Sequence, residues 1–167
     1  MVLIMYYIEY YEFYMFKLNK MTDYAVVCLG MLSRNPGSSM SARELSEATG
    51  LTLYTVQKLL KLLVVKSNLI TAQRGACGGY ILNKKSSKIS VIEIIEALDG
   101  PISLTACVES SEDMCEASNI CFLGGKWNKV NDIIRKSLND ISLENLLNYE
   151  DTFPINNKKD IELRAIN

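Results

Sequence analysis

The fold is decided by residues 41–66, which read SARELSEATG LTLYTVQKLL KLLVVK. Ser41 and Glu44 have the spacing of a capping box, in which each side chain accepts a backbone N–H of the other residue, so a helix is predicted to begin here. Gly50 is typical of the position just after a helix. A short helix, a tight turn with glycine and a second helix over residues 53–66 form the helix-turn-helix pattern.

The second helix, which Thr52 can cap, has two chemically different faces. Its apolar side recurs at three- and four-residue spacing and is formed by Val56, Leu59, Leu60 and Leu63. The remaining positions are polar and basic, as in a recognition helix that lies in the major groove of DNA. The candidate DNA contacts are Thr52, Tyr54, Thr55, Gln57, Lys58 and Lys61. A merely solvated helix face is the alternative interpretation of the two lysines.

Residues 69–82 predict a β-hairpin directly after this helix. Leu69 to Arg74 has the composition of a strand and residues 80–82 that of the returning strand, around the glycine-rich turn Gly75-Ala76-Cys77-Gly78-Gly79. Such a hairpin is a wing. Arg74 and Gly75 at its bend are further candidates for DNA contact, because the negative potential of the minor groove attracts a guanidinium group. A hairpin that serves packing only is the alternative.

Two more helices are predicted beside this unit. The apolar spacing predicts one from about Asn19 to Arg34. A second capping box at Ser90 and Glu93 begins another, which Asp99-Gly100-Pro101 ends. The predicted fold class is therefore mainly α with a small β wing, a winged helix-turn-helix domain followed by a long dimerisation helix.

The 167-residue chain has a net charge of only −1, but its charges are segregated. Residues 15–90 carry 11 Lys and Arg against 3 Asp and Glu, whereas residues 91–167 carry 7 against 14. This separation favours a module that binds a polyanion, joined to a segment that does not. The chain contains no histidine, which excludes Ser-His-Asp and Cys-His enzymes. No apolar run is long enough to cross a membrane.

Cys107, Cys115 and Cys121 lie in an acidic, polar loop with the spacing Cys-x7-Cys-x5-Cys. The odd number of cysteines and the lack of a secretory signal indicate a reducing cytoplasm, where such a cluster binds metal more often than it forms disulfides. Soft thiolates select zinc, copper(I) or iron–sulfur clusters, and three of them leave a tetrahedral site one ligand short. A thiol redox switch and three incidental cysteines are the alternatives. Cys28 is expected in the core, and Cys77 is expected to have no special role.

An amphipathic helix is predicted over Lys126 to Ile141. Its apolar stripe consists of Trp127, Val130, Ile134, Leu138 and Ile141. An apolar stripe so late in a small chain needs a partner, and a homodimer would place two recognition helices in successive turns of the groove. The alternative is a helix that folds back on its own core.

Residues 15–147 resemble the Rrf-type (IscR/NsrR-like) winged-helix transcriptional regulators. The resemblance is carried by KLNKMTDYA at 17–25, the helix-turn-helix, RGACGGY at 74–80 and the three cysteines. The stretch LDGPISLTAC at 98–107 and the helix that begins near Trp127 look most like the members that regulate SUF iron–sulfur assembly genes.

This resemblance implies roles for individual residues. Residues 52–66 would be the recognition helix, and residues 126–141 would be the dimer helix. The three loop cysteines would bind an iron–sulfur cluster, expected to be [2Fe-2S]. In one member the fourth ligand is a histidine shortly after the third cysteine, where this chain has Phe122-Leu123-Gly124. In others it is a carboxylate in the first helix of the partner subunit, and Asp23 matches that place.

The sequence thus divides into five predicted parts: an N-terminal extension of doubtful origin or an extra contact helix (1–14), the winged helix-turn-helix DNA-binding domain (15–100), the cysteine loop (101–125), the dimerisation helix region (126–149) and a disordered tail (150–167). The predicted protein is a cytoplasmic homodimer that binds a double-stranded DNA operator and senses iron–sulfur or redox status. It is not an enzyme and has no membrane contact or small-molecule substrate. A zinc or thiol-switch loop and a small iron–sulfur electron carrier are the alternatives.

Overall fold

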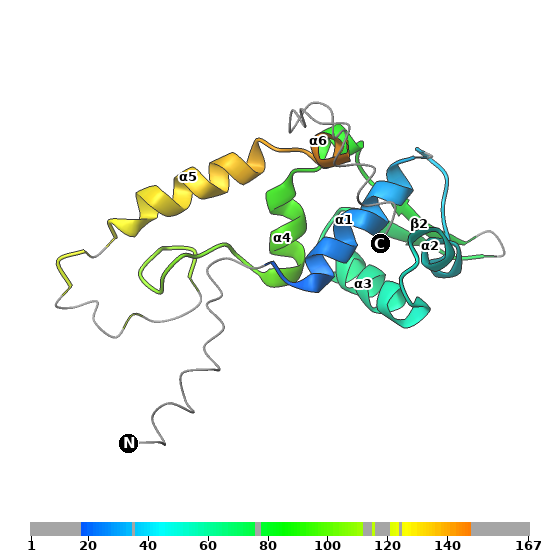
Figure 1. Ribbon diagram of the computed structural model, residues 1–167, viewed down its shortest axis with the longest axis horizontal. Helices are drawn as coiled ribbons and strands as arrows, with labels where there is room; N and C mark the ends of the chain where they lie inside the picture. Colours follow the sequence, from blue (N-terminus) through cyan, green and yellow to red (C-terminus); the bar gives the residue numbers. More distant parts are fainter. Residues whose placement is uncertain are drawn as a thin grey trace, which may run out of the picture.

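The computed structural model describes residues 18–34, 36–75, 78–111, 115, 121–123 and 125–147. Figure 1 shows its elements in chain order: α1 (Lys20–Ser33), α2 (Ala42–Thr49), α3 (Leu53–Lys66), β1 (Ile70–Gln73), β2 (Gly79–Leu82), the short 3-10 helix η2 (Ser86–Lys88), α4 (Val91–Asp99), α5 (Trp127–Asn139) and α6 (Leu143–Leu147). The predicted fold class, mainly helical with a two-stranded wing, is confirmed. The predicted extension 1–14 and tail 150–167 lie outside the described residues. In the described part, no helix has the length and apolarity needed to cross a membrane.

The helix-turn-helix is fixed locally by its caps. Ser41 Oγ accepts the backbone N–H of Glu44 at 3.2 Å, and a Glu44 carboxylate oxygen accepts that of Ser41 at 2.7 Å. The backbone hydrogen bond from Ser41 lowers the pKa of the Glu44 carboxyl, which thus stays charged at the positive end of the helix. The helix ends at Gly50, whose φ of 73° is left-handed, and Thr52 caps α3. The predicted bounds of α3 are confirmed.

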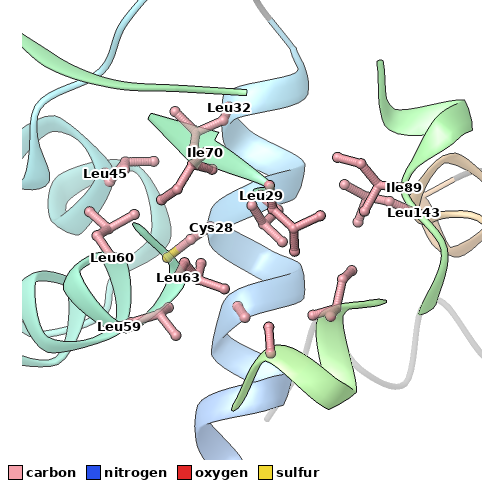
Figure 2. Packing of buried hydrophobic residues seen from close by; sticks show 14 of the residues in the cluster. Cys28, Leu29, Leu32, Leu45, Leu59, Leu60, Leu63, Ile70, Ile89 and Leu143 are labelled. Carbon is pink, nitrogen blue, oxygen red and sulfur yellow. The ribbon is translucent and has the colours of Figure 1, made fainter. Parts of the chain in front are cut away.

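One apolar core then sets the angle of α3. Its leucines pack, together with Leu45 of α2, against α1 and β1 (Figure 2). Fully or almost fully buried members of this core include Cys28, Leu29, Leu32, Leu45, Leu59, Leu60, Leu63 and Ile70. Full burial of each leucine side chain contributes about 1.5–3 kcal/mol, so the basic side of α3 has to face away from the core.

The wing is an antiparallel pair in which Ile70 faces Leu82 and Gln73 faces Gly79. It is also joined to the start of α2, because Met40 and Tyr80 exchange both backbone hydrogen bonds, at 3.0 and 2.8 Å. A Cβ on Gly79 would lie 2.6 Å from the carbonyl oxygen of Met40, so this position has to be glycine. The strand β1 is one residue shorter at each end than predicted, since Leu69 and Arg74 lie just outside it, whereas β2 begins one residue earlier than predicted, at Gly79.

After the cysteine loop, the chain forms a projecting helix and then packs again beside the start of α4. In Figure 1, α5 projects from α4 away from α2, α3 and the wing. Its C-terminal end comes back: Ile141 accepts the N–H of Val91 at 2.8 Å, and Leu143, fully buried, donates to Ile89 at 2.7 Å. The helix α5 ends at Asn139 instead of the predicted Ile141, because residues 141–143 form this bridge. The sequence did not predict η2 and α6.

The capping box at α2 gives a first prediction. Ser41→Ala removes the oxygen that accepts the Glu44 N–H, and should lower the free energy of unfolding by about 1 kcal/mol. Urea denaturation followed by circular dichroism measures this loss. Ser38→Ala is the matched control, because Ser38 is exposed and lies outside every helix and strand. Equal midpoints for the two variants would contradict the assigned cap.

Candidate nucleic-acid interface and cysteine loop

The outer side of α3 presents the side chains expected to contact DNA. Tyr54 is 75% exposed, and Thr52, Gln57, Lys58 and Lys61 are exposed as well. Thr55 differs, since it is half-buried and its hydroxyl shares a 2.9 Å hydrogen bond with that of Thr52. Thr55 therefore contributes to the start of the helix, while the other candidates stand free of the core.

The wing presents its candidates on the same structural unit. Arg74 and Gly75 are exposed directly after β1, whereas Ala76 and Cys77 lie outside the described residues. The strand β1, which ends directly before Arg74, packs against α3 through Ile70 and the α3 leucines. Helix and wing are thus held at a fixed separation by one core, as a two-part DNA contact requires.

The positive charges of this unit are available for a polyanion. In the described part of the chain the ion pairs are Lys84–Glu93 and Arg135–Glu96. Neither pair includes a lysine of α3 or Arg74 of the wing. The charges of the α3 lysines and of Arg74 face solvent, as is expected of side chains that bind phosphates.

The loop cysteines are partly buried free thiols. Cys107, Cys115 and Cys121 lie between α4 and α5, and the Cys107 sulfur is 3.2 Å from the hydroxyl of Thr105. Three soft thiols in one loop have the chemistry of an iron–sulfur or zinc site. Over the residues that the structure describes, however, no group of three or more cysteine, aspartate or glutamate side chains is close enough to hold a metal ion. The structure therefore does not bring the three cysteines, or Asp23, together within one chain.

Cys28 has a different environment. It is buried in the main core, and this burial raises the pKa of its thiol to about 11. A thiol with such a pKa stays protonated near neutral pH, and the thiolate is the form that binds metals. The expectation that Cys28 is a packed core residue is confirmed. Cys77 lies outside the described residues.

Asp23 is exposed on the first turn of α1. That turn is attached to the end of α4, because an Asp99 carboxylate oxygen accepts the hydroxyl of Thr22 at 2.9 Å and the backbone N–H of Asn19 at 3.4 Å. Thr22 is buried. Since the cysteine loop starts just after Asp99, these bonds fix the position of Asp23 relative to the entry of the loop.

The proposed dimer stripe is divided between two environments. Trp127 is 40% and Val130 41% exposed at the free end of α5. Ile134 is half-buried, and Leu138 packs with Ile141 against α4. The C-terminal part of the stripe therefore packs on the chain's own core, which was the alternative to a dimer contact. The sequence missed Ile133, which is 58% exposed, because it lies beside the stripe and not on it.

Asn131 is a second residue that sequence reasoning missed. It is on the same side of α5 as Trp127, Ile134 and Leu138, yet it is only 2% exposed and its side chain bonds to the cysteine loop. The sequence does contain a signal for this role, namely an asparagine within an apolar stripe. A buried amide requires hydrogen-bond partners, so such a position indicates a polar contact with another segment.

The comparisons with known proteins agree with this architecture. The Rrf2 model, described as an iron-dependent transcriptional regulator, matches residues 18–149. The chain belongs to the Rrf2 family. The HTH-type transcriptional regulator IscR of Photorhabdus laumondii is 31% identical over 121 residues, which are 72% of each chain. Its counterpart in Pectobacterium carotovorum is 29% identical over the same length.

Solved structures of Rrf2-type regulators have the same fold. CymR, the global cysteine regulator of B. subtilis, matches with a TM-score of 0.60 and 27% identity, over 81% of this chain and 98% of that one. IscR of T. potens matches with a TM-score of 0.56 and 26% identity, over 86% and 93%. This Rrf2 protein is accordingly a DNA-binding transcriptional regulator related to IscR, and its relatives are regulators, not enzymes. The family resemblance seen in the sequence is confirmed.

Proposed function

We propose that this Rrf2 protein is a homodimer that binds a double-stranded DNA operator and responds to iron–sulfur or redox status through its cysteine loop, in control of iron–sulfur assembly genes. The observation that carries the proposal is the arrangement of the chain. A basic helix and wing rest on one core, and the loop that carries three free thiols connects α4, which packs on this core, to the projecting helix α5.

The proposed DNA contacts divide between two grooves. The exposed side chains of α3 enter the major groove, namely Thr52, Tyr54, Gln57, Lys58 and Lys61, while Thr55 holds Thr52 in place. Arg74 and Gly75 of the wing approach the adjacent minor groove, where a guanidinium group is favoured. Lysine contacts to phosphate supply affinity, and the polar α3 side chains are placed to read base edges.

Removing one phosphate contact should weaken binding and change its salt dependence. For Lys58→Ala and Arg74→Ala we expect weaker operator binding, and the slope of log K against log salt should fall by about one unit if the lost contact is to phosphate. Fluorescence anisotropy with a labelled operator at several salt concentrations measures both. Lys136→Ala, an exposed position on α5, is the matched control. Unchanged affinity with both Lys58 and Arg74 removed would refute the DNA interface.

The proposed dimer contact uses the free end of α5. Exposed apolar side chains gather there and at the end of the preceding loop: Phe122, Leu123, Trp127, Val130 and Ile133. So many large apolar groups in one region are typical of a surface that binds another protein. A second copy of the chain is the partner that also pairs the recognition helices, and Ile134 and Leu138 would support this surface from behind.

A charge in this surface should separate the subunits. Trp127→Asp would place an unpaired carboxylate in the interface, at a cost on the order of 3–5 kcal/mol, and is expected to give monomers in sedimentation velocity. Asn139→Asp introduces the same charge at the exposed end of the same helix and should leave the dimer intact. A Trp127→Asp protein that stays dimeric would show that this end of α5 packs within its own chain.

The proposed cofactor is a [2Fe-2S] cluster. Cys107, Cys115 and Cys121 would hold it, and Asp23 of the partner subunit would supply the fourth ligand. A bound cluster supplies metal–thiolate bonds that close the loop and that are lost on oxidation or iron loss. The support is the soft donor set and the exposure of Asp23 at the entry of the loop. Cluster binding would favour one arrangement of the loop and of α5, and so shift the population of dimers that fit the operator.

Replacing any one of the three cysteines should have the same effect as replacing the others. Each single Ser variant should lose most of its bound iron and sulfide, because the site loses a soft ligand. The measurement is iron and sulfide analysis with ultraviolet–visible absorption of protein purified without oxygen. Cys28→Ala and Cys77→Ser are the controls and should keep the wild-type content. Loss of iron in only one of the three variants would refute a shared site.

A heterodimer tests the part of this proposal that concerns Asp23. One subunit carries Asp23→Ala and the other Cys107→Ser. If ligation crosses the dimer, both defects fall on the same site and one intact site remains, so about half of the wild-type iron is retained. Two equally impaired sites would place the fourth ligand elsewhere.

A thiol switch in the same loop is the second candidate function. The three cysteines are free thiols, and the structure of Staphylococcus aureus CymR in an oxidised form matches this chain with a TM-score of 0.55 and 26% identity. Colourless, iron-free protein from anaerobic cells with ample iron, whose operator affinity changes on mild oxidation, would favour this function over a cluster.

A further inference from the structure

We propose that Asn131 is the positioning residue that couples the Cys107 segment to helix α5. The proposal deepens the sensing function above and rests on it: if the state of the cysteines regulates DNA binding, the change has to reach α5 through a physical contact. The side chain of Asn131 is that contact.

The hydrogen bonds of Asn131 reach both ends of the segment 102–110. Its Oδ1 accepts the backbone N–H of Leu104 at 3.1 Å. Its Nδ2 donates to the carbonyl oxygen of Ile102 and to the hydroxyl of Ser110, both at 3.1 Å. The Ser110 hydroxyl in turn donates to Ile102 at 2.9 Å, which closes a ring of bonds around the segment. Every polar group of this buried amide therefore has a partner in the cysteine loop.

Asn128 makes a second attachment one turn earlier in α5. Its Oδ1 accepts the backbone N–H of Glu109 at 3.1 Å, and its Nδ2 donates to the Glu109 carboxylate at 3.2 Å. Cys107 lies between Leu104 and Glu109, so the chain is fixed to α5 on both sides of this cysteine. A displacement of Cys107 has to strain or break these bonds.

The same region contacts α4. Glu96 of α4 forms an ion pair with Arg135 of α5, and the same Glu96 oxygen accepts the backbone N–H of Ile102 at 3.4 Å. Helix α4 also carries Ile94 in the main core, which holds the recognition helix. Helix α4 thus contacts the loop and α5 through Glu96, and the core that holds α3 through Ile94.

A role in packing alone would not require an amide. Trp127, Ile134 and Leu138 share the side of α5 with Asn131, and an aliphatic side chain would continue their stripe without the cost of burying polar atoms. The three hydrogen bonds of the Asn131 side chain all reach groups of the cysteine loop. The Asn131 amide therefore fixes the position of residues 102–110. When its hydrogen bonds break, the polar groups of that segment have to bond to water instead.

Hydrogen exchange of the full-length, iron-free protein tests the coupling directly. Asn131→Ala should raise exchange of the Leu104 amide by about tenfold, the ratio that follows from losing one hydrogen bond. It should also raise exchange at the start of α5. Asn128→Ala, at a less buried position, should do the same at Glu109 and serves if Asn131→Ala does not fold. Asn139→Ala, the same change at the exposed end of α5, should leave both regions unaltered.

Operator binding provides the second measurement. The wild-type ratio of operator Kd between protein reconstituted with iron and sulfide and iron-free protein should move toward one in Asn131→Ala. Iron and sulfide content should stay at the wild-type value, since Asn131 is not a ligand. A purely structural defect would instead lower DNA affinity in both states.

The outcomes separate the coupling from the sensing function. A wild-type protein whose operator affinity does not respond to reconstitution refutes sensing through a cluster, and the exchange data then still decide the coupling. Unchanged exchange at the loop and at the start of α5 in both asparagine variants overturns it. So does a variant that loses the loop bonds yet keeps the full wild-type ratio.

Discussion

Burial of the leucine side of α3 against α1 is the constraint on which the helix-turn-helix and the wing depend. Leu59, Leu60 and Leu63 leave water by packing in the core on the side of Cys28 (Figure 2), and this packing leaves Lys58 and Lys61 exposed. The wing is bound to the same core and is also joined to the start of α2. Its position relative to α3 therefore follows from packing and does not need a bound operator.

What the sequence predicted well are the features set by neighbouring residues. The capping boxes at Ser41 and Ser90 and the spacing of apolar residues in α1 to α4 act within one or two turns, so they can be seen in the sequence. The short helices η2 and α6 were missed because their bounds depend on distant contacts. Leu143 is buried because residues 141–143 pair with residues 89–91, which are far away in the chain.

The cysteine site shows the opposite limit. The spacing of the three thiols identifies a candidate ligand set. The loop has no periodic pattern of apolar residues, however, so its sequence does not predict the path of the backbone or where the thiols lie. The described residues of one chain do not assemble these ligands, and a ligand from a second subunit leaves no local trace in the sequence. Asn131 was missed for a related reason: its partners, Ile102, Leu104 and Ser110, lie more than twenty residues away.

Helix α4 connects the cysteine loop to helix α3 through its packing. Ile94 and Ala97 belong to the main core with α3, whereas Val91, Ile92 and Ile95 form a second cluster with Ile102, Leu138 and Ile141. Because α4 is apolar on both sides, it cannot shift relative to α5 without disturbing the core beneath the recognition helix. Under the proposed sensing function, a rearrangement of the loop that moves α5 would therefore act on this core through close packing over a single helix.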